Sequence, residues 1–241
     1  MLDWLKHESS EAPQIELDGR SLPIVIRRLA HARRLTLRLS PDGSEVRVSM
    51  PRWGRTGEAL AFARARAAWL ARQIAAMPQG DSPAAGGSLT YRGGALAIAH
   101  SLSGPRRVRL GTDAIQLGGP SETLPTRLRR WLTAEARLLL AADLADYCAR
   151  AGRPVPKLAL SNAQRRWGSC SAKSAIRINW RLVMAPDYVR RSVVAHEVAH
   201  LVHFDHSPGF HALLADIYEG DIAEANRWLK REGRGLYVAF G

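Results

Sequence analysis

The chain of 241 residues contains few cysteines, few lysines and no long hydrophobic run. Cys148 and Cys170 are too few for a disulfide framework, and this scarcity fits a reducing cytoplasm. No segment approaches the roughly 20 consecutive apolar residues that are needed to cross a bilayer. Charged residues interrupt the N-terminal segment MLDWLKHESSEAPQ, so no signal peptide is expected. The sequence therefore predicts a soluble cytoplasmic protein with no membrane partner.

Acidic residues and lysines are both scarce relative to arginine. The net charge is +13 and the isoelectric point is near 10.9. Of the 35 basic residues, only four are lysines: Lys6, Lys157, Lys173 and Lys230. Arginine suits bidentate phosphate contacts better than lysine does, so this composition favours a polyanionic partner such as nucleic acid, a nucleotide or an acidic protein. Genomic base composition explains the same arginine excess equally well.

The N-terminal half alternates apolar and polar residues, a pattern that is typical of β-strands. Three such segments lie between Ile15 and Met50, and Pro41-Asp42-Gly43 predicts a hairpin turn between the last two. Residues 56–76 have the periodicity of a helix. After a loop rich in Pro, Gly and Ser, four more short strands are expected in LTYR, ALAIAHSL, RVRL and AIQL. No internal repeat is apparent.

Gly118-Gly119-Pro120 precedes a stretch rich in Leu and Ala, which predicts a helix from about 122 to 150. The domain boundary is placed here, with a β-rich domain over 1–119 and a catalytic domain over 120–241. In the second domain, KLALSN and AIRINW predict two strands. Further helices are expected at 186–204, 208–218 and 222–231. The expected fold class is α+β, with a mostly antiparallel N-terminal β region and its helix, followed by a helical domain with a small sheet.

Residues 196–200, HEVAH, place two histidines one helical turn apart with a glutamate beside the first. Positions i and i+4 share a helix face, so both imidazoles can bind one tetrahedral zinc ion. Glu197 is then directed toward the fourth coordination position, where it can take a proton from zinc-bound water and deliver it to the leaving group. The surrounding segment VVAHEVAHLVH is apolar, which indicates a buried helix. Burying two histidines without a metal or other partner would be costly.

A catalytic zinc usually has three protein ligands and one open position. His206 follows His200 by six residues, just after the expected helix end, so the chain can curl it back toward the metal. This spacing favours His206 as third ligand over His203 or His211. Metzincins share the spacing but have a Gly where this chain has His203 and a Met-containing turn downstream, whereas no Met follows Met184 here. A metzincin is therefore disfavoured.

Several motifs occur together and in a fixed order. RRWGSCS occupies residues 165–171 and HEVAHLVHFDHSPGF occupies residues 196–210. Between them come Ile178-Asn179, Leu182, Pro186 and Tyr188-Val189. In this combination the sequence resembles the YgjP-like metallopeptidase family, a zincin-like group. The segment RRLTLRLSPDGSEVRVSMP and the following helix with Trp69 also look like the family's N-terminal region, so the resemblance covers most of the chain.

The resemblance implies one Zn²⁺ ion held by three histidines, with a glutamate as catalytic base: His196, His200, His206 and Glu197. It also implies that Arg166, Trp167 and Ser169 of the RWGSC loop lie beside the active site. A hairpin turn organised around Trp167 as a core anchor is an equally good interpretation of that loop. The chain has Val198 where Leu is more usual and His211 where Trp is frequent, which affects the expected shape of the substrate pocket and not the metal. Imidazole ligands also accept Mn, Fe, Co, Ni or Cu.

We therefore expect a zinc-dependent metallohydrolase, and first a metallopeptidase that cleaves peptides or proteins, with Arg166 as a candidate oxyanion donor. One alternative is a nucleoside triphosphate pyrophosphatase, because the arginine excess suits an anionic substrate. Another resembles SprT-like proteases that act on proteins attached to DNA, with the basic N-terminal sheet as a nucleic-acid platform. A scaffold with a structural zinc would need a fourth ligand from Cys170, His203 or His211, and Glu197 argues against it.

Overall fold

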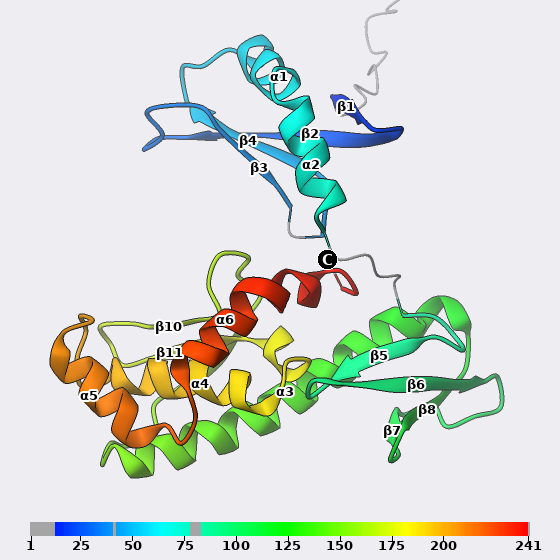
Figure 1. The fold of residues 1–241 in the computed structure, drawn as a ribbon. Coiled ribbons are helices and arrows are strands. Elements are labelled where there is room, and N and C mark those ends of the chain that lie inside the picture. Colours follow the sequence, from blue (N-terminus) through cyan, green and yellow to red (C-terminus); the bar gives the residue numbers. More distant parts are fainter. Residues whose placement is uncertain (1–12, 41, 78–82, 241) are drawn as a thin grey trace, which may run out of the picture. The chain divides into compact units, whose positions relative to one another are not determined.

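The computed structural model describes residues 13–40, 42–77 and 83–240 (Figure 1). Its described residues form two compact units, one over 13–77 and one over 83–240. The predicted domain boundary at 119/120 falls inside the second unit. The reason is that apolar residues of the strands before the boundary, such as Ile98 and Ile115, pack in one core with Leu124 and Leu128 beyond it.

The first unit is a four-stranded sheet covered by two helices. Its strands are β1 (Gln14–Leu17), β2 (Arg20–Leu29), β3 (Thr36–Leu39) and β4 (Val46–Pro51), in the spatial order β1-β2-β4-β3. The outer pairs are antiparallel and the central pair β2–β4 is parallel. Alternate residues of β4, namely Val46, Val48 and Met50, are fully buried, as the period of a one-sided sheet requires.

Residues 56–76 form two helices rather than the single predicted one: α1 (Thr56–Arg64) and α2 (Ala67–Ala75). No Gly or Pro marks the break at Arg66, whose backbone leaves the helical region with φ −115° and ψ 16°. At this break the Arg66 guanidinium stacks on the Phe62 ring, 3.7 Å from the ring centroid. Ala59, Ala63 and Leu70 supply the buried face of the helix pair against the sheet.

The second unit begins with another four-stranded sheet, β5 (Ser88–Tyr91), β6 (Gly94–Ser101), β7 (Arg109–Leu110) and β8 (Ala114–Gly118). Its spatial order is β5-β6-β8-β7, again with antiparallel outer pairs and a parallel central pair. The first hairpin of each sheet turns on two residues with positive φ, Asp18-Gly19 in one and Arg92-Gly93 in the other. A helix follows each sheet. The two halves of the N-terminal region are therefore topological repeats, which the sequence did not reveal.

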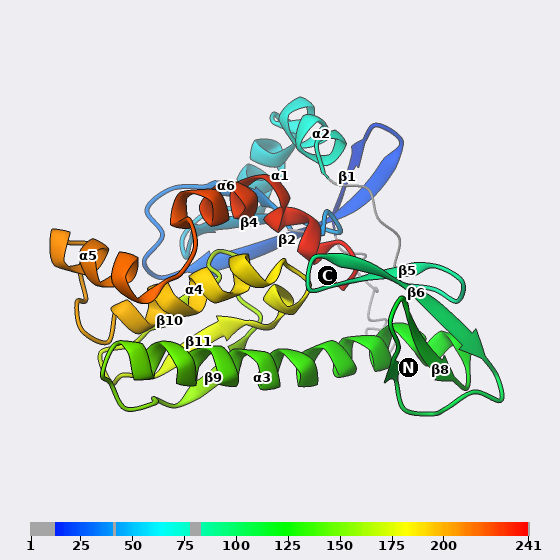
Figure 2. The same cartoon turned by 60° about the horizontal axis from the view of Figure 1, so that its bottom comes forward.

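The helix after the second sheet is α3 (Leu124–Arg150), which runs the length of the second unit (Figure 2). It buries a residue about every fourth position, including Leu124, Leu128, Leu132, Ala136, Leu140 and Leu144. Against it lies a small sheet ordered β10-β11-β9, made of β9 (Leu158–Ser161), β10 (Gly168–Cys170) and β11 (Ile176–Asn179). β10 lies within the segment that was expected to be a loop, and it forms the edge of this sheet.

Three helices complete the second unit: α4 (Asp187–Ala199), α5 (Pro208–Ile217) and α6 (Ile222–Glu232). The predicted α+β class is observed, with helices gathered after the first strands. α4 ends earlier than expected, because the amides of Val202 and His203 both bond back to the carbonyl of Ala199 in a tight turn. Among the described residues, no helix is long and apolar enough to span a membrane.

Candidate metal centre

Ion pairs fix the first half of α4, the helix that carries HEVAH, to α3. The Arg190 side chain is 3% exposed, and its Nε lies 2.7 Å from Oδ2 of Asp143, which is 5% exposed. Arg191, the next residue, reaches Asp143 and Asp146 of α3 and also Glu219. Breaking one member of such a buried set leaves an uncompensated charge, so the network holds α4 in one position on α3.

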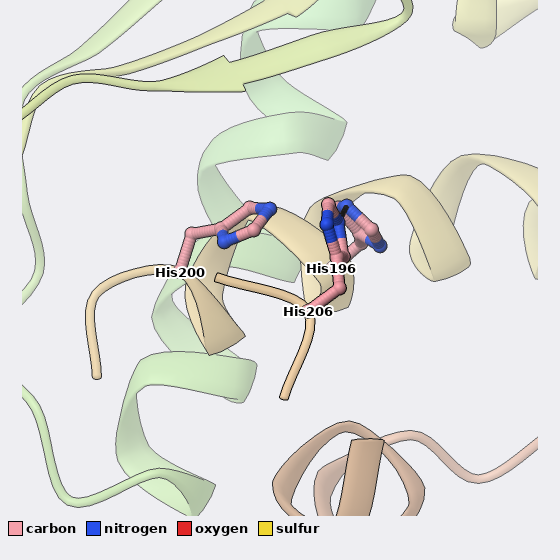
Figure 3. Close-up of side chains that lie close together, drawn as sticks. All are labelled: His196, His200 and His206. Carbon is pink, nitrogen blue, oxygen red and sulfur yellow. Dashed lines mark hydrogen bonds between the residues drawn. The ribbon is translucent and has the colours of Figure 1, made fainter. Parts of the chain in front are cut away.

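Three imidazoles converge at the C-terminal end of α4 (Figure 3). His196 lies in its last turn, His200 is the cap residue, and His206 returns from the loop that leads to α5. One ring nitrogen from each lies within 4.8 Å of the others, and Nε2 of His196 is 3.3 Å from Nε2 of His206. In the described part of the chain this is the one cluster of His, Cys, Asp and Glu with metal-binding spacing.

The surroundings fix how these rings present their nitrogens. Nδ1 of His200 lies 3.0 Å from the carbonyl oxygen of His203. A carbonyl only accepts, so Nδ1 carries the proton and Nε2 keeps its lone pair. Burial, together with the charges of neighbouring histidines, lowers the pKa of His196 to about 4, which keeps this imidazole neutral. Phe210 of α5 is fully buried and packs on all three rings, with centroid distances of 4.6 to 5.0 Å.

Glu197 points from α4 toward β10 rather than toward solvent. It is 5% exposed, and its Oε2 has no hydrogen-bond partner among the described residues. Burial raises the pKa of Glu197 to about 7, although the charge of Arg166 and a hydrogen bond from the Cys170 amide act in the opposite direction. A buried carboxyl group with one oxygen lacking a hydrogen-bond partner, beside a histidine cluster, is a perturbed acid-base group of the kind found at functional sites.

The RWGSC loop lies against this carboxyl group. A Cβ at Gly168 would stand 2.4 Å from Oε1 of Glu197, so only glycine leaves room for the carboxyl. Ser169 follows on the same strand, and Arg166 is close enough for its charge to act on Glu197. Trp167 instead packs against Tyr237, with ring centroids 5.6 Å apart, and against Gly233. The loop thus borders the site, while its tryptophan anchors it to the core.

The other candidate ligands do not join the cluster. His203 directs its carbonyl to His200 and packs its ring on Gly209. His211 is exposed, with its ring centroid 6.3 Å from that of His206. Burial, followed by the charge of Glu197, raises the pKa of the Cys170 thiol and disfavours the thiolate that binds metals. A closed site with four protein ligands is therefore not assembled by the described residues.

The residues present fit a zinc ion. Three imidazoles with converging nitrogens are a known catalytic donor set, and the bond from His200 to a carbonyl is the usual outer support of such a ligand. The orphaned Oε2 of Glu197 supplies a buried acceptor next to that donor set. The arrangement can therefore hold one transition metal and place a base beside it.

Comparison with known proteins bears on the same residues. The model of the YgjP-like metallopeptidase domain matches residues 33–232. This chain belongs to that family. The match covers both α4 with its histidines and the β10 loop, and it extends into the first unit. No curated protein and no solved structure matches the chain significantly. Membership of the YgjP-like family supports a metallopeptidase-type hydrolase that uses a metal.

Sequence reasoning missed several residues that position this centre. Phe210 falls within a sequence motif that says nothing of its packing, yet it is the apolar surface on which the three imidazoles pack. Asp143 and Arg190 were not singled out, because their pairing joins helices that are far apart in the sequence. The signal that could have found them is a charged residue on the apolar face of each predicted helix, where burial demands a partner.

Proposed function

We propose that this chain is a zinc-dependent peptidase in which His196, His200 and His206 hold one zinc ion and Glu197 is the catalytic base. The observation that carries the proposal is the buried carboxyl of Glu197, whose Oε2 has no hydrogen-bond partner among the described residues, beside three converging imidazoles. A zinc ion bound there supplies a Lewis acid that polarises a carbonyl and makes an attacking water more acidic. Family membership supports the same class of reaction.

The residues of this chain divide the remaining work. Glu197 takes a proton from the attacking water as its oxygen bonds to the carbonyl carbon, and returns the proton to the leaving nitrogen as the C–N bond breaks. Its raised pKa suits this exchange, because a carboxyl that titrates near neutrality both accepts and releases a proton readily. Arg166 is exposed and its charge acts on Glu197, and in this proposal it stabilises negative charge on the carbonyl oxygen.

β10 gives the substrate a place to lie. It is the edge strand of its sheet, so one side of its backbone is unpaired within the sheet, and it contacts α4. An extended peptide can add to such an edge by main-chain hydrogen bonds. Ser169 is the central residue of β10, and its two neighbours, Gly168 and Cys170, both lie against Glu197. This arrangement favours an unfolded or extended protein segment as substrate.

A phosphoanhydride substrate is the second candidate, because the charge of Arg166 beside the base would also attract a nucleotide. The deciding experiment offers the zinc-loaded protein a quenched fluorescent unfolded protein, with and without DNA, and separately a panel of nucleoside triphosphates. We expect cleavage of the unfolded protein, lost in Glu197→Gln while bound zinc stays the same. Activity on nucleotides alone, or full activity in Glu197→Gln, would refute the proposal.

The assignment of His206 as a zinc ligand is tested with a matched pair of variants. His206→Ala should lower zinc affinity by at least the roughly 10- to 100-fold that even the loss of outer-shell partners causes. His203→Ala keeps the backbone carbonyl that supports His200 and should retain zinc. Equal zinc affinity in both variants, measured by competition with a chromogenic chelator, would remove His206 from the ligand set.

A further inference from the structure

Each topological repeat has a groove at the same place, between the segment that leads into its edge strand and the helix that follows its sheet. The groove of the first unit has a volume of about 590 Å³, and its lining includes Arg34, Leu35, Leu37, Phe62, Arg66 and Trp69. The groove of the second sheet has a volume of about 300 Å³, and its lining includes Arg106, Arg107, Val108, Arg127, Arg130 and Trp131. We call these the first and second repeat grooves. Neither is lined by the metal centre.

The helix residues of the two grooves have the same spacing. Phe62, Arg66 and Trp69 follow one another at intervals of four and three in the first groove. Arg127, Trp131 and Ala134 do so in the second. In the second groove these residues lie on one helix, α3, where positions i, i+4 and i+7 share a face. In the first groove they span the junction of two helices, with Phe62 in α1, Arg66 at the break and Trp69 in α2. The two grooves therefore share their location and the spacing of their helix-side residues.

Both grooves combine arginine with an aromatic ring and lack acidic residues. Arg34, Arg66, Arg106, Arg107 and Arg130 are exposed, and none forms a salt bridge with a described residue. The stretch from Ser88 to Ala134 contains seven arginines and two acidic residues. Arg127 differs from the others, because it donates to the carbonyls of Gly118 and Arg106 and so shapes the second groove.

The aromatic rings are accessible from these grooves. Trp69 is 40% exposed, which is unusual for a side chain of this size. Trp131 is half-buried and supported from behind by Tyr91, with ring centroids 5.1 Å apart. A flat ring beside exposed guanidinium groups that form no salt bridge with a described residue matches a ligand that alternates planar bases with phosphates. An acidic peptide would use the arginines and leave the tryptophans without a role.

We propose that the two repeat grooves bind single-stranded nucleic acid, with bases stacked on Trp69 and Trp131 and phosphates on the surrounding arginines. Stacking on aromatic rings tolerates any base, and arginine contacts to phosphate carry no sequence information. Binding is therefore independent of sequence and strongly dependent on salt. The function is separate from hydrolysis, since no groove residue belongs to the metal centre.

The test measures fluorescence anisotropy of labelled 20-nucleotide oligothymidine and oligouridine with the full-length protein from 50 to 200 mM salt. Binding of either strand supports the proposal, and the two arms distinguish DNA from RNA. The groove variants are Arg34→Gln/Arg66→Gln and Arg107→Gln/Arg130→Gln. Each removes two phosphate contacts, so the slope of log affinity against log salt should fall by about 1.4, at roughly 0.7 per contact for single strands.

Matched controls separate a site from general positive charge. Arg64→Gln/Arg72→Gln and Arg129→Gln/Arg137→Gln remove as much charge from the same helices without touching either groove. They should leave the affinity within about twofold of the parent. Trp69→Leu should weaken binding about fivefold or more, whereas Trp69→Phe keeps a stacking surface and should restore most of it. Thermal melts verify that each variant is folded.

Three results would overturn the proposal. The first is equal loss of affinity in groove and control variants, which would mean diffuse electrostatics. The second is that a polyglutamate peptide or a double-stranded oligonucleotide binds as tightly and with the same dependence on the groove variants. The third is absence of binding at 50 mM salt. Peptidase activity should be unchanged in all groove variants, so failure of the hydrolase assignment leaves this test intact.

Discussion

The two topological repeats use the same hairpin turn in opposite ways. In the first unit, a Cβ at Gly19 would meet nothing within 4 Å. In the second unit, a Cβ at the equivalent Gly93 would stand 3.0 Å from Cα of Pro186, directly before α4. The amides of Arg92 and Gly93 also donate to the carbonyls of Val183 and Met184. One turn is open to solvent on that side, and the other is docked against the helix that carries the metal centre.

The difference shows how one arrangement of strands becomes either a self-contained module or part of a larger core. The first sheet closes its own small core with Leu70 and the other buried residues of its two helices. The second sheet contributes Ile98 and Ile115 to a core that continues through α3 to α4. Substitutions should therefore act on one unit at a time, and the following changes test that expectation.

The largest effect is expected for Asp143→Ala, which leaves the buried Arg190 guanidinium without its main partner. The free energy of unfolding of the second unit should fall by about 3 to 5 kcal/mol. Hydrogen exchange measured by mass spectrometry on the full chain should show faster exchange over residues 83–240 and no change over 13–77. Asp146→Ala, at a more exposed ion pair, should cost less than about 1 kcal/mol. An equal increase of the hydrogen-exchange rate in both units would contradict the conclusion that the two units have separate cores.

A pair of core truncations compares the two units directly. Leu70 and Leu132 are both fully buried, one in each core. Each change to alanine should cost about 2 to 5 kcal/mol in its own unit. Leu70→Ala should leave zinc affinity unchanged, whereas Leu132→Ala should lower the temperature at which the protein releases zinc. A loss of zinc affinity at 25 °C in Leu70→Ala would show that the first core supports the metal centre.

Gly168→Ala tests whether the position of the Glu197 carboxyl depends on the absence of a Cβ at residue 168. The added methyl would lie within 2.7 Å of three side-chain atoms of Glu197, so the carboxyl must move. If Glu197 is the base that we propose, this displacement should lower kcat/KM on the order of 100-fold. Zinc content and the exchange pattern of the first unit should be unchanged. Gly57→Ala in α1, with nothing near its Cβ, is the matched control and should have full activity.

The smallest expected effect is a pH dependence of stability that comes from Glu219, the most exposed carboxylate of the ion-pair network. Burial disfavours the charge on Glu219, but hydrogen bonds from Arg191 and Tyr147 outweigh it and lower the pKa to about 2. Because the folded pKa is depressed, the stabilisation is present above about pH 4.5 and is lost as the pH falls toward 2. After allowance for solvent screening it amounts to about 1 kcal/mol.

Urea unfolding from pH 7 to pH 3 provides the measurement for Glu219. The difference in stability between the parent and Glu219→Gln should shrink as the pH falls from 4.5. The first unit, whose described residues form no such network, should show no corresponding difference. A gap that stays constant with pH would assign the effect of the substitution to packing rather than to charge.

Local patterns predicted much of this fold. Alternation located seven strands of the two four-stranded sheets, and α3, α5 and α6 end within about two residues of their expected limits. The Asp42-Gly43 part of the predicted turn does join β3 to β4, while Pro41 lies outside the described residues. Such features depend on neighbours in the sequence, which is why periodicity is enough to find them.

Features that depend on distant neighbours were not predictable. The parallel pairs β2–β4 and β6–β8 leave no mark in alternation, since antiparallel and parallel strands share the period of two. The helix break at Arg66 has no Gly or Pro to signal it. For the metal centre, the spacing of HEVAH predicts that His196 and His200 share one helix face. The contact of Phe210 with their rings depends instead on how α5 packs, which no local pattern gives.

The open turn at Asp18-Gly19 has a practical consequence for labelling this protein. A short peptide tag or a cysteine for a fluorophore inserted between these two residues meets no neighbouring atoms at Gly19 and lies at the tip of a hairpin, where added length is tolerated. The same insertion between Arg92 and Gly93 would separate the hairpin from Pro186. The first turn is therefore the position at which a reporter can be carried without disturbing α4.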